Sequence, residues 1–222
     1  LEKSLDEIRA FFSRLHDAGT VPVSAGGDHS ITLPILRAIA TDHPVGLVHF
    51  DAHCDTGDDY LGSKFHHGAP FRRAVEEGLI DPKRTIQIGI RGSLNDLDQW
   101  QFSHDTGMRV IYMDEFYELG VKAVISEIHR VVGKNPCYLT FDVDGLDPVY
   151  ASGTGTPEVG GFSTVEAQLM IRGCRGLNLI GGDVVEVAPP FDPSGNTALT
   201  GATMMFEILC IVADAVAGRG GA

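Results

Sequence analysis

The sequence predicts an α/β fold, a three-layer α/β/α sandwich built around a mostly parallel sheet. Two apolar periods alternate along the chain: short β-branched runs, and longer stretches with helical spacing. A strand–helix–strand order is typical of parallel strands joined by crossover helices. The run Val45-Gly46-Leu47-Val48 is apolar without alternation, as burial of both sheet faces requires.

The expected elements follow from this pattern in chain order. A helix opens the chain at 4–18, where apolar residues recur at helical spacing: Leu5, Ile8, Phe11, Phe12 and Leu15. The β-branched runs predict strands at 20–25, 45–50, 85–90, 109–113, 137–141 and 179–187. The stretches between them predict helices at 30–40, 70–77, 119–132, 163–172 and 198–217.

Length and composition indicate one soluble globular domain over residues 1–222. A chain of this size buries roughly 70% of its unfolded surface, enough for a core without disulfides. The hydrophobic fraction is 43% and the charged fraction 21%, which excludes a disordered or collagen-like chain. No Pro- or Ser-rich linker divides the chain, and the Gly-Arg-Gly-Gly-Ala tail at 218–222 is expected to fray.

The charge balance limits the partners that we expect. With 17 basic and 30 acidic residues the net charge is −13, which disfavours nucleic acid and suits a cationic substrate or bound metal cations. No run of eighteen apolar residues predicts a membrane span, so we expect no membrane partner. The four cysteines form no C-x-x-C pair, so a reducing cytoplasm is the expected location.

Asp, His and Glu residues, which can bind metals or transfer protons, follow the apolar runs of four expected strands. Ligands of open α/β sheets bind beyond the carboxyl ends of the strands, so these residues are the candidates for a site. The segments are G-G-D-H-S at 26–30, D-A-H-C-D at 51–55, D-V-D-G-L-D-P at 142–148, and Glu186.

Their spacing predicts a metal site. On an extended chain residues i, i+2 and i+4 face one way, so Asp51, His53 and Asp55 converge, as do Asp142 and Asp144. These carboxylates would repel one another without a cation, and no Lys or Arg lies inside the segments. One D-x-H or D-V-D alone is more often a helix cap. The presence of all these Asp and His residues at the end of one sheet indicates a bound metal ion.

The donor set suggests two ions and a particular metal. The candidate ligands are four Asp and two His, too many for one tetrahedral zinc with an open position: His29, Asp51, His53, Asp55, Asp142 and Asp144. Oxygen-rich sites with some imidazole suit Mn²⁺. A pair of such ions produces a nucleophilic hydroxide near neutral pH. His49 is interpreted as strand packing and Cys54 as a core residue.

At these residues the chain closely resembles the manganese ureohydrolases, which include arginase, agmatinase and the guanidino-acid hydrolases. Further matching stretches, in family order over nearly the whole chain, are H-G-A-P-F-R-R at 67–73, G-T-G-T-P-E at 153–158 and D-V-V-E-V-A-P-P at 183–190. The stretch at 67–73 and P-P-F-D at 189–192 are more similar to the agmatinase and guanidino-acid branch than to arginase.

The resemblance implies hydrolysis of a linear guanidino compound to urea and an amine at two Mn²⁺ ions. His29, Asp51, Asp55 and Asp142 would hold the first ion; His53, Asp51, Asp142 and Asp144 would hold the second. It further implies that Asp144 accepts a proton and that His67, or its neighbour His66, protonates the leaving amine. Glu186 would bind the guanidinium and Thr156 would help to orient it.

The substrate within this class stays open between agmatine and short guanidino acids such as 4-guanidinobutanoate and 3-guanidinopropanoate. Gly57 stands where arginases place an Asn for the amino-acid end of arginine, which disfavours arginase. Asp58 and Asp59 could attract an ammonium, whereas Tyr60, Arg72 or Arg73 could help to bind a carboxylate. An aromatic residue at Tyr60 is similar to the guanidino-acid branches. The alternative is that the loop at 56–65 is solvated and that its charged side chains face water rather than the substrate.

Three other interpretations remain at this stage. Formimidoylglutamase resembles the same motifs and would release formamide. A zinc deacetylase of related architecture is disfavoured by His29 and Asp55, which add a second metal site. A non-catalytic, metal-stabilised paralogue is the third. Family members carry an N-terminal stretch before the G-G-D-H segment, so we expect a catalytic domain that lacks it. The resemblance also implies a homo-oligomer, a trimer or a hexamer.

Overall fold

The computed structural model describes residues 1–94 and 98–219. A six-stranded parallel sheet forms its centre, with strand order β1-β6-β5-β2-β3-β4. The strands are β1 (Val23–Ala25), β2 (Val45–Phe50), β3 (Ile80–Ile90), β4 (Arg109–Tyr112), β5 (Cys137–Asp142) and β6 (Leu179–Val185). The predicted parallel sheet is confirmed.

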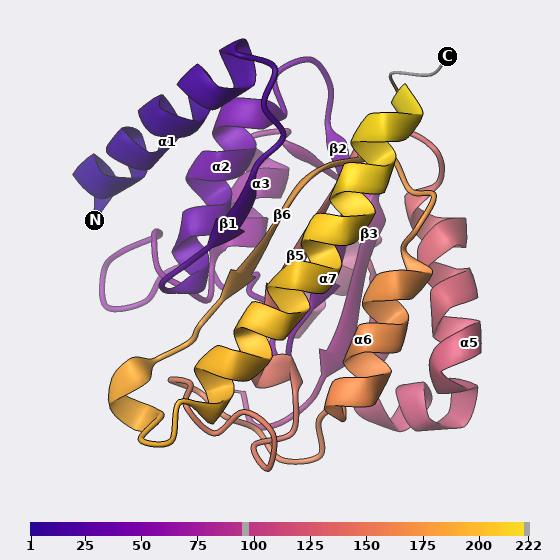
Figure 1. The fold of residues 1–222 in the computed structure, drawn as a ribbon. Helices are drawn as coiled ribbons and strands as arrows, with labels where there is room; N and C mark the ends of the chain where they lie inside the picture. The colour runs from indigo at the N-terminus through magenta and orange to yellow at the C-terminus, as the bar shows by residue number, and fades with distance from the viewer. Residues whose placement is uncertain (95–97, 220–222) are drawn as a thin grey trace.

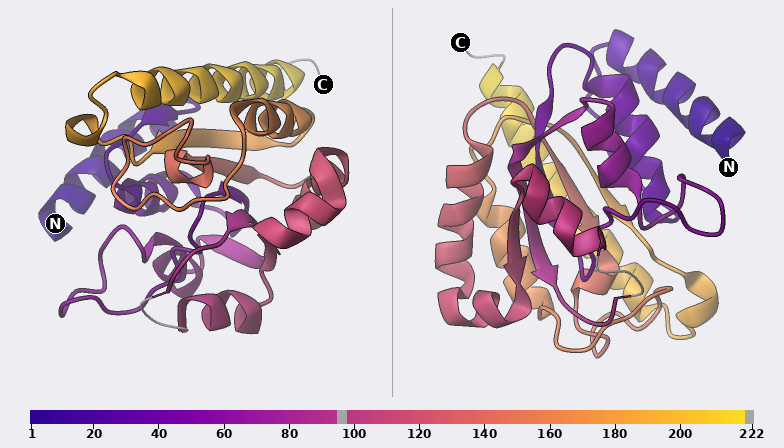
Figure 2. Two further views of the ribbon diagram at one scale, coloured as in Figure 1. Left: turned by 90° about the horizontal axis from the view of Figure 1, so that it is seen from below. Right: turned by 180° about the vertical axis from the view of Figure 1, so that it is seen from behind.

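Helices cover both faces of the sheet, which completes the predicted three layers (Figure 1). One face carries α5 (Met113–Val132), α6 (Thr164–Gly173) and α7 (Asn196–Arg219). On the other lie α2 (Thr32–Ile39) and α3 (Pro70–Glu76), with α1 (Glu2–Asp17) packed on α2 and α4 (Asp98–Thr106) against β3 and β4. The second view in Figure 2 shows α2 and α3 in front of the sheet.

Each face has its own hydrophobic core. The larger core joins β2, β3 and β5 to α5, α6 and α7 through residues such as Phe50, Phe141 and Ile208, all fully buried. The smaller core lies under α2 and α3 and includes Leu36, Phe71 and Tyr138. All six residues of β2 are buried, as the unalternating apolar run predicts.

The main differences from the sequence prediction concern four elements, β3, α4, α5 and α7. β3 begins at Ile80 rather than at 85, because Ile80 pairs with Val45 and a register shift then carries Pro82 past the ladder. α4 was not predicted, since its apolar pattern is weak. α5 begins at Met113 and continues through a kink at Gly120, whose φ is 72°. α7 stays helical through Arg219, and the rest of the expected frayed tail, 220–222, lies outside the described residues.

The connections after four adjacent strands lie at one end of the sheet. Short 3-10 turns follow two of them: η1 (His29–Ile31) lies a few residues beyond β1, and η2 (Val143–Gly145) comes directly after β5. A third turn, η3 (Pro189–Phe191), follows β6. Because β1, β6, β5 and β2 are neighbours in the sheet, their carboxyl ends bring segments from residues 28 to 186 together.

Candidate metal centre

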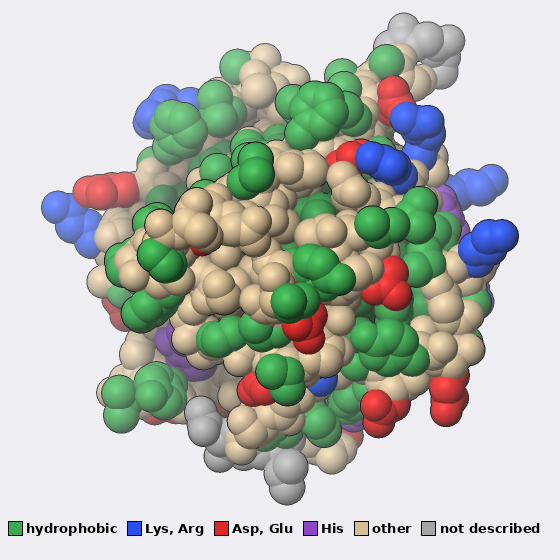
Figure 3. Space-filling model, turned by 60° about the horizontal axis from the view of Figure 1, so that its bottom comes forward, with side chains coloured by type: hydrophobic (Ala, Val, Ile, Leu, Met, Phe, Trp, Pro, Cys, Tyr) green, Lys and Arg blue, Asp and Glu red, His purple; other side chains and the backbone are tan. Residues whose placement is uncertain are grey.

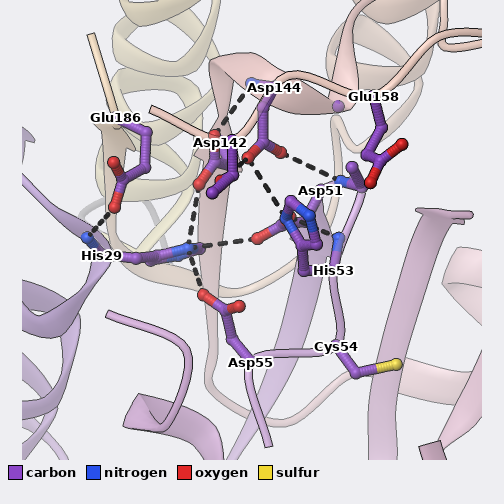
Figure 4. Close-up of polar contacts among 12 residues, drawn as sticks. His29, Asp51, His53, Cys54, Asp55, Asp142, Asp144, Glu158 and Glu186 are labelled. Carbon is purple, nitrogen blue, oxygen red and sulfur yellow. Dashed lines mark hydrogen bonds and ion pairs between the residues drawn. The ribbon is translucent and has the colours of Figure 1, made fainter. Parts of the chain in front are cut away.

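The six predicted ligands meet at this end of the sheet. His29 comes from η1, Asp51, His53 and Asp55 from the loop after β2, and the remaining two from the β5–η2 junction (Figure 4). Three groups of ligand atoms, each within 4.8 Å, cover all six residues: His29, His49 and Asp51; Asp51, His53 and Asp55; Asp51, Asp142 and Asp144. Their role as metal ligands stays a prediction, but the structure brings them together.

His29 faces three carboxylates with the same ring nitrogen. Its Nδ1 lies 3.1 Å from Asp51 Oδ2, 2.9 Å from Asp55 Oδ2 and 3.2 Å from Asp142 Oδ2. The ring is fully buried, and Nδ1 makes no hydrogen bond of acceptable geometry. A buried nitrogen surrounded by oxygens without a hydrogen bond is the arrangement that a metal ion satisfies.

The contact of the second ring nitrogen of His29, Nε2, fixes the tautomer of the ring. That tautomer leaves Nδ1 free to bind a metal ion. His29 Nε2 lies 2.8 Å from Thr140 Oγ1, and Thr140 donates its only hydroxyl proton to Asp183 at 2.5 Å. Thr140 can therefore only accept from His29, which puts the proton of the neutral ring on Nε2. The lone pair on Nδ1 then faces the carboxylates.

His53 forms the second half of the cluster. Its Nδ1 lies 3.3 Å from Asp51 Oδ1 and 3.2 Å from Asp144 Oδ2. Asp51 thus directs one oxygen toward His29 and the other toward His53. A carboxylate shared in this way is what a bridge between two ions requires. The residues present fit two metal ions, one beside each histidine.

Backbone N–H groups hold the carboxylates in place. Ala52 N–H donates to Asp144 Oδ1 at 3.1 Å, and His53 N–H donates to Asp51 Oδ1 at 2.6 Å. Asp144 N–H donates to Asp142 Oδ1 at 2.8 Å, so Asp142 also caps η2. The cap alternative therefore holds for one oxygen of Asp142, while its other oxygen faces His29.

Burial and mutual repulsion shift the pKa values of this cluster in the metal-free protein. Burial, then the charges of Asp144 and Asp51, raise the pKa of Asp142 well above its usual range. Burial and the Asp51 charge also raise the pKa of Asp144. Burial opposes charge on His53, but Asp144 and Asp51 outweigh it and raise its pKa to about 12. Without a divalent ion, burial and the neighbouring negative charges therefore disfavour the ionised forms of Asp142 and Asp144.

Glu186 lies beside the cluster in a strained conformation. Its φ is 65°, in the left-handed region, and Asp55 has a φ of 52°. The backbone N–H of His29 donates to Glu186 Oε1 at 2.7 Å. Burial raises the pKa of Glu186 to about 7, although that N–H and the charge of His67 oppose the rise. Strained backbone at two residues of one site is typical of functional positions.

The other predicted site residues lie beside Glu186 and Asp144 or in the loop that follows Asp55. His67 Nδ1 is 3.6 Å from Glu186 Oε1, and the His67 side chain is 48% exposed. Thr156 donates to Asp144 Oδ2 at 3.3 Å. Tyr60 is 55% exposed, and its ring packs against His66 with centroids 5.7 Å apart. His66 has a buried Nε2 without a hydrogen-bond partner.

One expectation from the sequence needs correction, and a second one holds. His49 is not simple strand packing, because its Nε2 lies 2.7 Å from Asp51 Oδ2 and Gln87 Nε2 lies 3.1 Å from its Nδ1. Spacing could have shown this, since His49 and Asp51 are two residues apart on one strand face. Cys54 is buried and points away from the cluster, as expected (Figure 4).

The arginines at 72 and 73 do not face the site as free cations. Arg73 is 4% exposed and donates to Asp58 at 2.8 Å and to Glu76 at 3.0 Å. Arg72 pairs with Asp98 and Asp58. These ion pairs tie the loop after Asp55 to α3, so Asp58 is also engaged rather than free to attract an ammonium group.

Sequence reasoning missed a buried cation behind the cluster. Arg91 is 9% exposed, and its guanidinium donates to backbone carbonyls in three segments. The acceptors are Gly89, Asp144, Gly145, Leu146, Glu158 and Val159, at 2.7–3.2 Å. No motif contains Arg91, so only its position just after a strand could have drawn attention to it.

The sequence pattern of the arginase family matches residues 1–210. The chain belongs to the arginase family. It is 58% identical to guanidinopropionase of Pseudomonas aeruginosa over 215 residues, 96% of this chain and 68% of that protein. It is 50% identical to the mitochondrial agmatinase of Gallus gallus over 213 residues, 96% of this chain and 63% of that protein.

Solved structures agree with this assignment. The structure of proclavaminate amidino hydrolase from Streptomyces clavuligerus superposes with a TM-score of 0.93 at 39% identity, covering 97% of this chain and 72% of that one. This arginase-family chain therefore spans about two thirds of the length of the relatives that it matches.

Proposed function

We propose that this arginase-family chain hydrolyses a linear guanidino compound to urea and the corresponding amine, using two Mn²⁺ ions. The observation that carries the proposal is a pair of adjoining groups of ligand atoms, which we call the cradle. His29 Nδ1 and His53 Nδ1 each face carboxylate oxygens, and Asp51 presents one oxygen to each histidine. Glu186 and His67 lie beside this cradle, where a guanidinium and its leaving amine would bind.

The ligand assignment is the one that the family resemblance implies, and the contacts of His29 with Asp51, Asp55 and Asp142 and of His53 with Asp51 and Asp144 support it. His29, Asp51, Asp55 and Asp142 would hold one ion, and His53, Asp51, Asp142 and Asp144 the other. When bound, such a pair of ions supplies a water-derived nucleophile near neutral pH and stabilises negative charge in the transition state. Nitrogen and carboxylate donors without thiolate favour Mn²⁺ over softer metals.

The chain's own residues would bind and orient the substrate. The Glu186 carboxylate accepts charge-assisted hydrogen bonds well, and a guanidinium presents donors in a planar fork. Burial disfavours the charged form of Glu186, so a cationic guanidinium would restore that charge by pairing with it. Thr156, which contacts Asp144, would help to orient the substrate.

Proton transfer would use two residues. Asp144 lies in the cradle and would accept the proton from the attacking water. The exposed His67 ring near Glu186 would donate a proton to the leaving amine, since a histidine can hold and release a proton near neutral pH. His66 is the competing donor, but its ring is less exposed and packs against Tyr60.

Similarity supports a short guanidino acid or agmatine as the substrate. The 58% identity to a guanidinopropionase makes 3-guanidinopropanoate the first candidate, and the agmatinase at 50% keeps agmatine in the set. Tyr60 would border the substrate tail from the loop after the metal segment. If it does, Tyr60→Ala will lower kcat/KM for the preferred substrate.

The test is urea release from the Mn²⁺-loaded chain on agmatine, 4-guanidinobutanoate, 3-guanidinopropanoate and L-arginine, with formamide release from N-formimidoylglutamate measured in parallel. Urea from one of the first three compounds is the expected result. Glu186→Gln should lower kcat/KM by at least about 100-fold, because a charge-assisted contact to the reacting group is lost. Glu118→Gln, an exposed residue of α5, should leave activity unchanged.

His67→Asn and His66→Asn separate the two histidines. Loss of a general acid lowers kcat by roughly 10²–10⁴-fold, so His67→Asn should fall in that range and His66→Asn should not. A chain that binds two Mn²⁺ ions yet releases no urea from any of the compounds contradicts the proposal. Formamide instead of urea would assign the formimidoylglutamase reaction.

A further inference from the structure

A row of buried polar side chains crosses the sheet next to the cradle. Neighbouring strands from β3 to β6 contribute one residue each, paired in register and fully buried: Gln87, His49, Thr140 and Asp183. His49 stands two residues before the predicted ligand Asp51. Thr140 likewise stands two residues before Asp142. Because side chains two apart on a strand share a face, the row lies one step behind the ligands.

Asp183 is the member of this row that carries a carboxylate, and the proposed reaction does not use it. Figure 3 shows acidic side chains scattered over the surface of the molecule, where water solvates them. Asp183, in contrast, is 0% exposed. A carboxylate that is removed from water keeps its charge only at a large cost in free energy, unless hydrogen bonds satisfy its oxygens.

Three hydroxyl groups satisfy the oxygens of Asp183. Thr140 Oγ1 donates to Oδ1 at 2.5 Å, Thr32 Oγ1 donates to Oδ2 at 2.7 Å, and the Tyr138 hydroxyl donates to Oδ2 at 2.9 Å. Burial raises the pKa of Asp183, and the charge of His29 and these three hydroxyls oppose the rise. The surroundings of this carboxylate thus consist of donors that stabilise its ionised form.

The link from Asp183 to the cradle runs through Thr140. His29 Nε2 lies 2.8 Å from Thr140 Oγ1, and the same hydroxyl contacts Asp183. A threonine hydroxyl has one proton, so this chain of hydrogen bonds can run in two directions only. An ionised Asp183 can only accept, so Thr140 donates to it and accepts from His29. The Nδ1 lone pair of His29 then faces the predicted ion.

A neutral side chain at position 183 permits the opposite direction. It can donate to Thr140, whose hydroxyl then donates to His29 Nε2. In that arrangement the proton of the neutral ring lies on Nδ1, the atom that must bind the metal. The negative charge of Asp183 therefore selects between a ring that binds metal and a ring that does not.

We propose that Asp183 is a positioning residue for the ion beside His29, and that its charge, acting through Thr140, holds the His29 ring in the tautomer and orientation that bind metal. This inference rests on the proposed function only in requiring a metal ion at His29, and not on the reaction or the substrate. Partners of this kind usually change metal affinity by about 10–100-fold when they are removed.

A purely structural role for Asp183 is the competing interpretation. The same carboxylate joins α2 to β5 through two other hydroxyls, so its loss can also loosen the fold. A loosened fold would weaken both metal sites alike. The ring of His53 faces the carboxylates of the cradle instead of Thr140. A positioning role therefore weakens the ion beside His29 and spares the ion beside His53.

The test measures the Mn²⁺ affinity of each site by itself, from the electron paramagnetic resonance signal of free Mn²⁺ during titration of the metal-free chain. His53→Asn isolates the ion beside His29, and His29→Asn isolates the other ion. In the His53→Asn chain, Asp183→Asn and Thr140→Val should each raise the dissociation constant by about 10–100-fold. In the His29→Asn chain the same two changes should leave it nearly unchanged.

Matched variants test whether Asp183 acts through Thr140. Thr140→Ser keeps the hydroxyl that Thr140→Val removes, so serine should retain most of the affinity. Tyr138→Phe removes another hydroxyl from Asp183 without breaking the link to His29, and should weaken binding much less than Thr140→Val does. Asp183→Asn and Thr140→Val combined should weaken binding no more than either change alone, because both break one chain of hydrogen bonds.

A measurement on the wild-type chain keeps the proposal testable even where Asp183→Asn does not fold. Nuclear magnetic resonance of the chain loaded with diamagnetic Zn²⁺ gives the charge of Asp183 from the chemical shift of its carboxyl carbon. An ionised carboxyl at neutral pH is the expected result. A protonated carboxyl would reverse the chain of hydrogen bonds and overturn the proposal.

The affinity measurements can overturn it in three further ways. Equal weakening of the two isolated sites would leave Asp183 a structural role alone, and unchanged affinity in the His53→Asn chain would remove any role toward the metal. Additive losses in the double variant would show that Asp183 does not act through Thr140. A wild-type chain that binds no Mn²⁺ contradicts this proposal and the proposed function together, whereas Mn²⁺ binding without urea release contradicts the proposed reaction only.

Discussion

At the residue scale, side chains outside the predicted ligand set control where the metal-facing atoms point. Thr140 and Asp183 hold the tautomer of His29, and His49 donates to the same Asp51 oxygen that faces His29. Hydrogen-bond partners of this kind usually affect metal affinity by about 10–100-fold when they are removed. The chemistry of the site therefore depends on more residues than the ligands.

Asp142→Asn tests the shared ligand. The change keeps the side-chain volume but removes the negative charge that both ions would share, so bound Mn²⁺ should fall from two per chain to one or fewer. Activity should fall by at least about 100-fold. Metal content by atomic emission after dialysis, with urea release, measures both. Asp105→Asn, an isosteric change on the surface of α4, is the control. Full retention of metal and activity would remove Asp142 from the ligand set.

His49→Phe tests the positioning role of the residue that sequence analysis assigned to packing. A phenyl ring fills the buried site but cannot donate to Asp51, so the Mn²⁺ concentration for half-maximal activity should rise by about 10–100-fold. Activity at saturating Mn²⁺ should change much less. Because packing alone would not move the metal dependence, an unchanged Mn²⁺ titration would restore the packing interpretation. His104→Phe, which removes a surface histidine, is the comparison.

The sequence allowed the six clustered residues to be predicted because they follow a rule that needs no coordinates. They stand within a few residues of the ends of apolar runs, and alternation along an extended segment puts Asp51, His53 and Asp55 on one side. His49 escaped notice because it lies inside a run whose burial was itself the prediction. Gln87 and Asp183 could not be linked to the site, since their partners lie far away in sequence on neighbouring strands.

At the element scale, the strands were easier to predict than the segments between them. Fully buried strands such as β2 and β5 are continuous apolar runs. β3 extends further toward its N-terminus than its apolar run because backbone pairing with Val45 holds Ile80. Only Trp100 and Phe102 provide apolar side chains to α4, too few for a helical period. Tertiary packing, which a single sequence does not encode locally, decides such elements.

One side chain, that of Arg91, joins several of the connections at the site end of the sheet. Its replacement is therefore a prediction at the scale of elements. Arg91 bonds carbonyls from the end of β3, from η2 and from the loop at 158–159. Arg91→Lys loses the planar fork and leaves several buried carbonyls unpaired, so the free energy of unfolding should fall by roughly 2–4 kcal/mol. Arg130→Lys, at an exposed ion pair on α5, should change it by less than about 0.5 kcal/mol.

Urea denaturation of the metal-free chains measures this difference. Because Arg91 also holds the backbone of Asp144, kcat/KM of the Mn²⁺-loaded variant should fall as well. Equal stability of Arg91→Lys and Arg130→Lys would show that the guanidinium fork contributes little and that water replaces its bonds.

At the scale of the whole molecule, the acidic cluster makes the fold depend on what occupies it. Asp51, Asp142 and Asp144 are buried together, and the raised pKa values of Asp142 and Asp144 express the free-energy cost of burying their charges and of bringing them close to one another. Bound divalent ions remove this repulsion in the folded state only. Binding to the folded state alone must stabilise it by mass action.

Thermal unfolding should therefore respond to Mn²⁺. At a free Mn²⁺ concentration 100 times the dissociation constant, one site adds about 2.7 kcal/mol. For a chain of this length 1 kcal/mol corresponds to roughly 2–4 °C, so the Tm should rise by roughly 5–10 °C over its value in EDTA. Mg²⁺ at the same concentration should raise it less, because imidazole nitrogen is a poor ligand for that ion.

The Asp142→Asn chain supplies the matched control for this shift. Its unfolding temperature in EDTA should equal or exceed that of the wild type, since the substitution removes one of the repelling carboxylates. Its rise on addition of Mn²⁺ should be much smaller, since a shared ligand is gone. Calorimetry of both chains with Mn²⁺, Mg²⁺ and EDTA measures these differences in Tm. A wild-type Tm that is the same in Mn²⁺ as in EDTA would mean that the cluster is neutralised by protons and hydrogen bonds, not by metal.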